Sequence, residues 1–314
     1  MILIVDAGNT TITFAAVLEE NDSIVKRIKV EEDSFQEDAV NIENSEELLN
    51  KWCRDIVKAL CDKEFTCHIG KSSMRTSYMT SNAPRGSHCG GIVDVAKATR
   101  RRRRISQARF FSNHEKVFSK AVISSVVMED EKALELIASK LADKYVFLSK
   151  DNCGLDLSKY SASTLGTDRM ADMIAAIDKY GDKLPLIVFD LGTATTCNVI
   201  DEKGCFLGGI IAPGLMTSAN ALLSKASRLK EYKVNEPLSI IGNTSQGCID
   251  SGIVYGHALM VEGIIRKVSE KLGKKCVAVM TGGNTEHVRD YIDSPFYYEP
   301  DLLLHGLISL AKKL

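Results

Sequence analysis

The sequence lacks long hydrophobic runs and has almost no net charge. No apolar stretch approaches the roughly 18–20 residues of a membrane-spanning helix, so we expect no membrane segment. The first apolar stretch ends at Asp6, which is not the pattern of a signal peptide. The formal net charge is −1 over 314 residues, so the whole chain shows no bias toward a polyanionic partner.

Paired cysteines and clustered histidines are also missing. The nine cysteines include no Cys-x-x-Cys pair, which argues against a disulfide framework and favours the reducing cytoplasm. The six histidines are scattered, and the pair Cys67–His68 is the nearest approach to a zinc-binding pattern. We therefore expect no zinc site.

The remaining composition is typical of a globular protein, with 45% hydrophobic and 26% charged residues. A chain of this length has room for two domains. A short pattern occurs twice: "DAGNTTITF" at residues 6–14 and "DLGTATTCNV" at residues 190–199. Ungapped alignment of Asp6 with Asp190 also superposes Gly8 on Gly192 and Thr11 on Thr195. This spacing indicates an internal duplication.

The pattern of apolar residues supports the duplication. Each half begins with three short strands separated by turns, then alternates helices with strands. In the first half we expect strands at 2–5, 11–18, 24–30, 120–127 and 146–150, and helices at 45–61, 130–145 and 167–181, with Ser45 as an N-cap. In the second half we expect strands at 186–190, 194–200 and 205–211, and a helix at about 246–272. We therefore predict an α/β protein with two domains of like topology, at 1–184 and 185–314.

One segment does not fit this plan. Residues 71–118 carry eleven Lys or Arg and two Asp or Glu, with weak apolar periodicity. We interpret about 64–118 as an inserted, largely disordered loop. The run Arg100–Arg104 is the only hint of nucleic-acid binding; no stacking aromatics accompany it, so a solvated insertion, or a frame-shifted stretch of coding sequence, is favoured.

The two strand-end acids have a chemical interpretation. Glycine in Asp-x-Gly permits a tight turn and close approach of a ligand to the backbone. Amides, Asn and Thr side chains at such a turn form a phosphate cradle. A carboxylate beside it suits Mg²⁺, which keeps most of its water. Two such turns facing each other across a cleft would bind a nucleoside triphosphate.

These motifs together resemble the superfamily of actin and the acetate and sugar kinases, and most closely type III pantothenate kinases. The resemblance covers about residues 1–62 and 119–314. It rests on "DAGNTTITF" (6–14), "ISSVV" (123–127), "GTDRMADMIAA" (166–176), "DLGTATTCNVI" (190–200), "GGIIAPGL" (208–215), "IGNTSQGCIDSGIVYG" (241–256), "TGGN" (281–284) and "DLLLHGL" (301–307). It implies two duplicated ribonuclease H-like (actin-like ATPase) domains with a cleft between them. The implied activity is ATP-dependent phosphorylation of pantothenate, the first step of coenzyme A synthesis.

The resemblance also implies site residues. Asp168 matches the general base, and Arg169 matches a residue that holds a polar group of pantothenate. From the residues alone, the favoured interpretation of Asp168 is an acid in the first turn of a helix, beside an exposed arginine. The other implied substrate contacts are Gly166, Thr167, Tyr160 and Thr244. Tyr160 lies one residue nearer Asp168 than the family pattern, and Thr244, expected to reach substrate across a homodimer interface, is alternatively a turn residue.

The nucleotide and ion sites follow from the same resemblance. The implied ATP and phosphate contacts are Asp6, Gly8, Asn9 and Thr10 in the first half, and Thr193, Thr195, Thr196, Gly282 and Gly283 in the second. Asp6 is expected near Mg²⁺, and Asp190 near a monovalent cation, K⁺ or NH₄⁺. Neither loop contains lysine, so such a cation would offset the phosphate charge.

Two other functions are compatible with these motifs. One is a nucleotide-binding regulatory or accessory protein of the same fold, for which the arginine run would supply a nucleic-acid contact. The other is a kinase of a different small hydroxyl compound. The presence of Asp6, Asp168 and Asp190 together favours an enzyme, because a scaffold need not keep all three.

Overall fold

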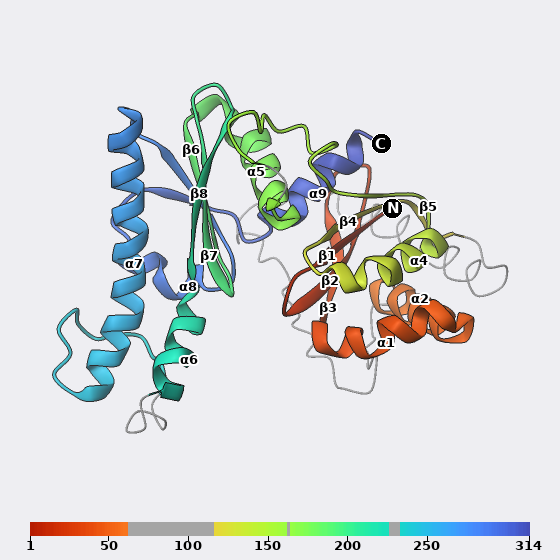
Figure 1. Cartoon of the computed structure of the whole chain (residues 1–314), viewed down its shortest axis with the longest axis horizontal. Helices are drawn as coiled ribbons and strands as arrows, with labels where there is room; N and C mark the ends of the chain where they lie inside the picture. Colours follow the sequence, from red (N-terminus) through yellow and green to blue (C-terminus); the bar gives the residue numbers. More distant parts are fainter. Residues whose placement is uncertain (62–115, 162–163, 226–232) are drawn as a thin grey trace, which may run out of the picture. The chain divides into compact units, whose positions relative to one another are not determined.

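The protein folds into two units, each built on a five-stranded mixed sheet (Figure 1). The computed structural model describes residues 1–61, 116–161, 164–225 and 233–314. One unit comprises Met1–Leu148 with Leu310–Leu314, and the other Ser149–Ser309. This division differs from the sequence duplication, whose expected boundary at 184/185 stays a prediction. The Arg100–Arg104 run and most of the expected insertion lie outside the described residues.

The first unit has the strand order β3-β2-β1-β4-β5. Its strands are β1 (Ile2–Ala7), β2 (Thr11–Val17), β3 (Ile24–Glu31), β4 (Phe118–Ser125) and β5 (Ala142–Phe147). The first three are antiparallel neighbours, and β4 and β5 run parallel to β1. Helices α1 (Glu32–Asn44), α2 (Glu46–Cys61) and α4 (Glu131–Leu141) share one core with the sheet.

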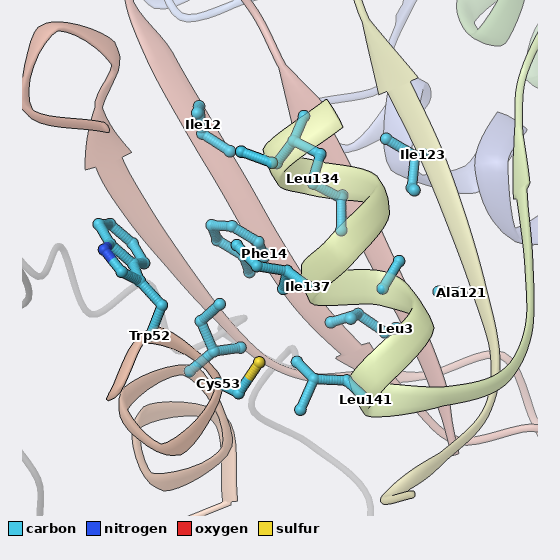
Figure 2. Close-up of a cluster of buried hydrophobic side chains, with 14 of the residues drawn as sticks. Leu3, Ile12, Phe14, Trp52, Cys53, Ala121, Ile123, Leu134, Ile137 and Leu141 are labelled. Carbon is cyan, nitrogen blue, oxygen red and sulfur yellow. The ribbon is translucent and has the colours of Figure 1, made fainter. Parts of the chain in front are cut away.

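The core of the first unit arises from alternate residues of the strands. Phe14 and Leu3 project from neighbouring strands toward Ile137 of α4 and Trp52 of α2 (Figure 2). Strand residues alternate between the two faces of a sheet, so every second position of β1 and β2 belongs to this core. Asp6 occupies the other set of positions, directly opposite Thr13 and Ser124.

The second unit repeats the same topology with the order β10-β9-β6-β7-β8. Its strands are β6 (Leu186–Leu191), β7 (Ala194–Ile200), β8 (Phe206–Pro213), β9 (Val277–Thr281) and β10 (Phe296–Tyr298). Its helices are α5 (Thr167–Tyr180), α6 (Leu215–Lys225), α7 (Ser245–Leu272), α8 (Thr285–Val288) and α9 (Leu302–Lys312), whose last residues belong to the first unit. Helices α5 and α7 lie on opposite sides of this sheet (Figure 1).

Backbone hydrogen bonds confirm the duplication. Gly8 N donates to Thr11 O at 3.0 Å, and Gly192 N donates to Ala194 O at the same distance. The strand pairs β2–β3 and β7–β8 also have a register shift at the equivalent place, Ala16/Val17 in one and Val199/Ile200 in the other. The expected fold class, α/β with two ribonuclease H-like domains of the actin-like ATPase type, is therefore confirmed for each unit.

The strand register corrects one detail of the sequence alignment. Asp6 lies opposite Thr13, whereas Asp190 lies opposite Thr196. The second turn is therefore one residue shorter than the first. The structural equivalent of Thr195 is Ile12, whereas the ungapped alignment paired it with Thr11.

Three other expectations need correction. Helix α1 was not predicted, because its apolar positions are few. The helix expected at 130–145 ends at Leu141, and β5 begins at Ala142, earlier than predicted. Phe118 is 1% exposed in β4, so the insertion as bounded at 64–118 overlaps a core strand. Ser45 is confirmed as an N-cap, since its Oγ accepts from Leu48 N at 3.3 Å.

Helix α7 can be compared with a membrane segment because it is 28 residues long and apolar. Within the described residues it is the one helix whose length and composition would allow it to cross a membrane. Val254, Ala258 and Val261 on one side of it are buried in the core with the sheet. A core helix meets the same criteria, so this observation is weak evidence for a membrane segment.

Candidate active site

The turn between β1 and β2 carries the first group of expected phosphate contacts. Asp6 is half-buried near the end of β1, while Asn9 and Thr10 are exposed. Glu32 N donates to Thr10 O at 3.1 Å, which ties the turn to the start of α1. The turn therefore has a fixed backbone with an exposed amide and hydroxyl side chain. Donors of these types suit phosphate oxygens.

The equivalent turn between β6 and β7 carries the second group. Thr193 is exposed at its tip, and its carbonyl oxygen accepts from Thr217 Oγ1 at 2.7 Å and from Gly214 N at 3.0 Å. The Gly192 carbonyl accepts from Asn284 Nδ2 at 2.7 Å. These bonds hold the turn against α6 and against the segment that follows β9.

Gly282 follows β9 and lies against the strand-end acid Asp190. It has a φ of 89°, and a Cβ on it would lie 2.3 Å from Asp190 Oδ1 and 2.6 Å from Leu191 backbone atoms. Only glycine fits there, because the backbone conformation and the space both exclude a side chain. A Cβ on Gly283 would meet nothing within 4 Å. The two glycines of "TGGN" therefore have different structural roles.

The two threonines of β7 face opposite sides of the sheet. Thr195 Oγ1 lies 2.8 Å from His257 Nε2 of α7, and both side chains are buried. Thr196 lies opposite Asp190, and its buried Oγ1 has no hydrogen-bond partner among the described residues. Thr196 therefore shares the face of Asp190, whereas Thr195 lies on the α7 face; a phosphate contact from either stays a prediction.

The N-terminus of α5 presents the Gly-x-Asp-Arg segment. Gly166 is the N-cap residue, and Thr167 and Asp168 form the first turn with half-buried side chains. Asp168 Oδ1 accepts from Arg169 N at 2.7 Å. A carboxylate at this position is favoured by the unpaired amides and the dipole of a helix N-terminus.

The negative charge of Asp168 affects the ionisation of Asp190. Burial, and after it the negative charge of Asp168, raise the pKa of Asp190 to about 6. A cation beside Asp190 would relieve both effects, since it stabilises the ionised carboxylate. The second unit therefore brings the expected base and the expected cation ligand into one site.

Arg169 extends along the same face of the sheet. Its Nε donates to Asn198 Oδ1 at 2.7 Å, and its Cζ lies 5.7 Å from the Phe206 ring centroid. Tyr160 packs on Phe206 at 4.7 Å between ring centroids. The structure thus places Tyr160 beside the Arg169 site. Sequence reasoning missed Asn198 and Phe206; the alternation along β7 put Asn198 on the Asp190 face and was the available signal.

Thr244 has a structural role that one of the two sequence interpretations anticipated. It is the N-cap of α7, and its Oγ1 accepts from Gly247 N at 3.0 Å. The side chain is exposed. This geometry establishes capping, while a contact to substrate stays a prediction.

Asp6 and Asp190 are the candidate metal ligands, and each is a single carboxylate. In the described ranges, no group of three or more His, Cys, Asp or Glu side chains is arranged to hold a metal. Asp6 and Asp190 each offer a strand-end carboxylate next to a glycine turn. One carboxylate fits Mg²⁺ when phosphates and water complete its shell. Asp6, Gly8, Asn9 and Thr10 belong to the first unit, and the other expected site residues belong to the second.

Comparison with known proteins gives consistent results. A family model described as type III pantothenate kinase matches residues 69–267. A type III pantothenate kinase of Thermomicrobium roseum is 34% identical over 212 residues, which cover 67% of this chain and 80% of the relative. An enzyme of the same name from Agathobacter rectalis is 37% identical over 161 residues, which cover 51% of this chain and 61% of the relative. The enzyme from Bacillus cytotoxicus is 32% identical over 198 residues, which cover 61% of this chain and 73% of the relative.

A solved structure supports the fold independently. A Campylobacter jejuni protein assigned to the Baf family of transcriptional activators aligns with a TM-score of 0.52. The alignment covers 99% of this chain and 98% of that protein, at 16% identity. At this identity the likeness shows a shared fold alone.

Proposed function

The chain belongs to the type III pantothenate kinase family, and on that premise we propose how its residues phosphorylate pantothenate with ATP, the first step of coenzyme A synthesis. The observation that carries the proposal is the Asp168 site. An accessible carboxylate begins α5, beside a second acid and a buried arginine. Family membership favours this enzyme over a regulatory protein and over a kinase of another substrate.

Asp168 acts as the general base. Its carboxylate is half-buried and accepts a backbone N–H, so it is held in place and remains accessible from one side. A carboxylate within hydrogen-bond reach of the primary hydroxyl of pantothenate can take its proton as the hydroxyl oxygen bonds to the γ-phosphorus of ATP, while the bond from that phosphorus to the β–γ bridging oxygen breaks and ADP leaves. The proton leaves the hydroxyl oxygen and passes to a carboxylate oxygen of Asp168.

The two strand-end turns bind the triphosphate. Asp6, Gly8, Asn9 and Thr10 contact the phosphates from the first unit, and Thr193 and Thr196 from the second; Thr195 supports its turn through His257 or contacts phosphate directly. Gly282 and Gly283 lie beside the nucleoside.

The two strand-end acids bind different cations. Asp6 holds Mg²⁺ through water, and bound Mg²⁺ neutralises charge on the phosphates. Asp190 holds K⁺ or NH₄⁺. Support for this comes from its raised pKa, because a buried acid beside Asp168 is costly to ionise without a nearby positive charge.

Pantothenate lies along α5 and β8. Gly166 and Thr167 contact it at the start of α5, and Arg169 and Tyr160 contact it further along. Thr244 contacts the substrate of the partner subunit in a homodimer. Exposed apolar side chains support a homodimer: Ile210 and Ile211 on the edge strand β8, Met216 on α6, and Ile240 and Ile241 before α7. Such a surface suits a second copy of this chain.

The location that fits the chain is the cytoplasm. The thiols of Cys53, Cys153, Cys197, Cys205, Cys248 and Cys276 are free. Free thiols, most of them buried, persist where the environment is reducing. Coenzyme A synthesis from ATP also places the substrates there.

The decisive experiment is a coupled assay of the full chain with pantothenate, ATP, Mg²⁺ and K⁺. The wild-type chain should turn over, and Asp168→Asn should lower kcat by about 10²–10⁴-fold. The variant should bind an ATP analogue with unchanged affinity by calorimetry, because the phosphate turns are intact. Near-normal turnover by Asp168→Asn would remove Asp168 as the base. No turnover by the wild-type chain would overturn the pantothenate kinase assignment.

A further inference from the structure

The guanidinium of Arg169 is held by three neighbours that carry no charge. Asn198 Oδ1 accepts from Nε at 2.7 Å in a buried hydrogen bond. The Phe206 ring lies 5.7 Å from Cζ, and Tyr160 packs on the same ring. Gly209 lies directly opposite Asn198 in the antiparallel pair β7–β8.

Gly209 makes the space that Arg169 occupies. A Cβ at this position would lie 3.0 Å from Arg169 Nη2 and 1.9 Å from the Cys197 carbonyl oxygen. The backbone of β8 therefore approaches both the arginine and β7 more closely than any residue with a side chain would allow. Gly209 and Asn198, which lie opposite each other on the two strands, together form the binding site of the Arg169 guanidinium.

The described residues supply no opposite charge in contact with the guanidinium of Arg169. Within the described part of the chain, no carboxylate forms an ion pair with its guanidinium, and the adjacent Asp168 carboxylate bonds to its backbone N–H instead. The residue is nevertheless only 7% exposed. A buried cation is normally paired, because removing it from water is costly. This arrangement therefore favours binding of an anionic group.

We infer that Asn198 is a positioning residue that sets substrate specificity by holding Arg169 through a neutral oxygen. The inference rests on the proposed function, in which Arg169 contacts pantothenate. Pantothenate has one carboxylate, and a guanidinium is the side chain best suited to bind it. An acidic residue at position 198 would hold Arg169 as firmly but would cancel the charge that selects the anion.

The second polar atom of Asn198 agrees with this role. Asn198 is fully buried, and its Nδ2 has no hydrogen-bond partner among the described residues. Because arginine has only donors, the Oδ1 of Asn198 must face Arg169, and the Nδ2 is left as a second donor next to the guanidinium. An oxygen of the substrate, or a water molecule, would satisfy it.

The test compares pantothenate with pantothenol, the neutral analogue in which a hydroxymethyl group replaces the carboxylate. Both keep the hydroxyl that accepts phosphate. The ratio of their kcat/KM values measures selection for the anion. Asn198→Asp, which is nearly isosteric, should lower this ratio about tenfold by raising KM for pantothenate. KM for ATP and kcat at saturation should stay unchanged.

Two further variants keep the test decisive. Asn198→Ala removes the acceptor without adding charge and should lower the ratio less than Asn198→Asp does; it replaces the aspartate variant if that variant does not fold. Asn21→Asp adds the same charge in the exposed β2–β3 turn, where the side chain only accepts from Ser23, and should leave the ratio unchanged.

The outcomes separate this inference from the proposed function. A ratio within about twofold of wild type in the folded Asn198 variants, or an equal loss for both substrates, overturns the inference. Wild-type protein that fails to phosphorylate pantothenate overturns the proposed function itself. Wild-type activity with an unchanged ratio in the variants leaves the kinase assignment intact and removes only the role of Asn198.

Discussion

At the scale of single residues, the site depends on close contacts that leave no room for ordinary side chains. Gly282 shows this directly, because its left-handed backbone brings the chain against Asp190 and Leu191. Asp190 then carries its charge in a half-buried, poorly solvated position near Asp168. Each of these features lowers stability by itself. Their presence at the strand end is what a ligand-binding site requires.

Replacing Gly282 tests this contact. Gly282→Ala should destabilise the second unit by about 2–4 kcal/mol, because it combines backbone strain with overlap against Asp190 and the Leu191 backbone. Gly283→Ala is the matched control and should change stability by less than about 0.5 kcal/mol, because its Cβ would enter open space. Thermal unfolding of both variants gives the comparison. Equal effects would show that the Gly282 contact is not restrictive.

The pH dependence of stability tests the burial of Asp190. The folded protein keeps the Asp190 proton up to a pH of about 6, whereas the unfolded chain releases it near 3.8, the ordinary pKa of an aspartate side chain. Stability therefore falls as pH rises through this window and stays lower above it. Asp190→Asn should raise stability at pH 8 by about 2 kcal/mol in buffer without K⁺ or NH₄⁺, with no difference below about pH 4.

Asp201, in the same unit, provides a control for which the opposite change in stability is expected. Lys159 bonds to Asp201 and lowers the pKa of that carboxyl, so Asp201→Asn should reduce stability at pH 8. Adding K⁺ should stabilise the wild-type protein and leave Asp190→Asn unchanged, if Asp190 is the cation ligand. An Asp190→Asn variant that is less stable than wild type at pH 8 in K⁺-free buffer would contradict the electrostatic assignment.

At the scale of elements, helix N-termini and strand ends position the functional groups. Helix α5 begins at the Gly-x-Asp-Arg segment, so its first turn presents Asp168 while Arg169 lies on the sheet. Helix α7 begins just after Thr244, whose hydroxyl caps it. The sequence patterns for both helices were sufficient to predict their limits to within a residue or two. The sequence pattern could not show whether Thr244 caps α7 or contacts substrate.

Substitution of Thr244 separates these two roles. Asp is a good N-cap, so Thr244→Asp should retain the stability of α7, whereas Thr244→Ala should lose about 1 kcal/mol. If Thr244 also contacts pantothenate, Thr244→Asp should raise KM for pantothenate while its melting temperature equals that of wild type. A wild-type KM in Thr244→Asp would limit Thr244 to capping.

At the scale of the whole molecule, the proposed homodimer rests on exposed apolar side chains of the second unit, some of them on the edge strand β8. Ile211 is 65% exposed and Ile241 is 81% exposed on the second unit. Exposed apolar side chains on an edge strand, such as Ile210 and Ile211 of β8, favour pairing with another surface, and Ile241 adds an exposed apolar side chain before α7. In a symmetric dimer each copy would cover the other, and Thr244 would lie near the interface.

Placing a charge on this surface tests the dimer. Ile211→Asp should convert the protein to a monomer in light scattering at micromolar concentration, because an unpaired charge would have to be buried at the interface. Activity should fall with dissociation if Thr244 acts across the interface. Val40→Asp is the control, since Val40 is an exposed apolar residue on α1 of the first unit. A dimeric Ile211→Asp variant would place the interface elsewhere.

The sequence by itself determined the duplication, the two mixed sheets and the strand-end acids, because these depend on local spacing and on alternation along single strands. Tertiary structure decided which side chains meet. The one-residue difference between the two turns moved the equivalent of Thr195 from Thr11 to Ile12. The residues that contact the Arg169 guanidinium are Asn198 of β7 and Phe206 and Gly209 of the neighbouring strand β8. Such contacts depend on strand register and helix packing, which local patterns do not encode.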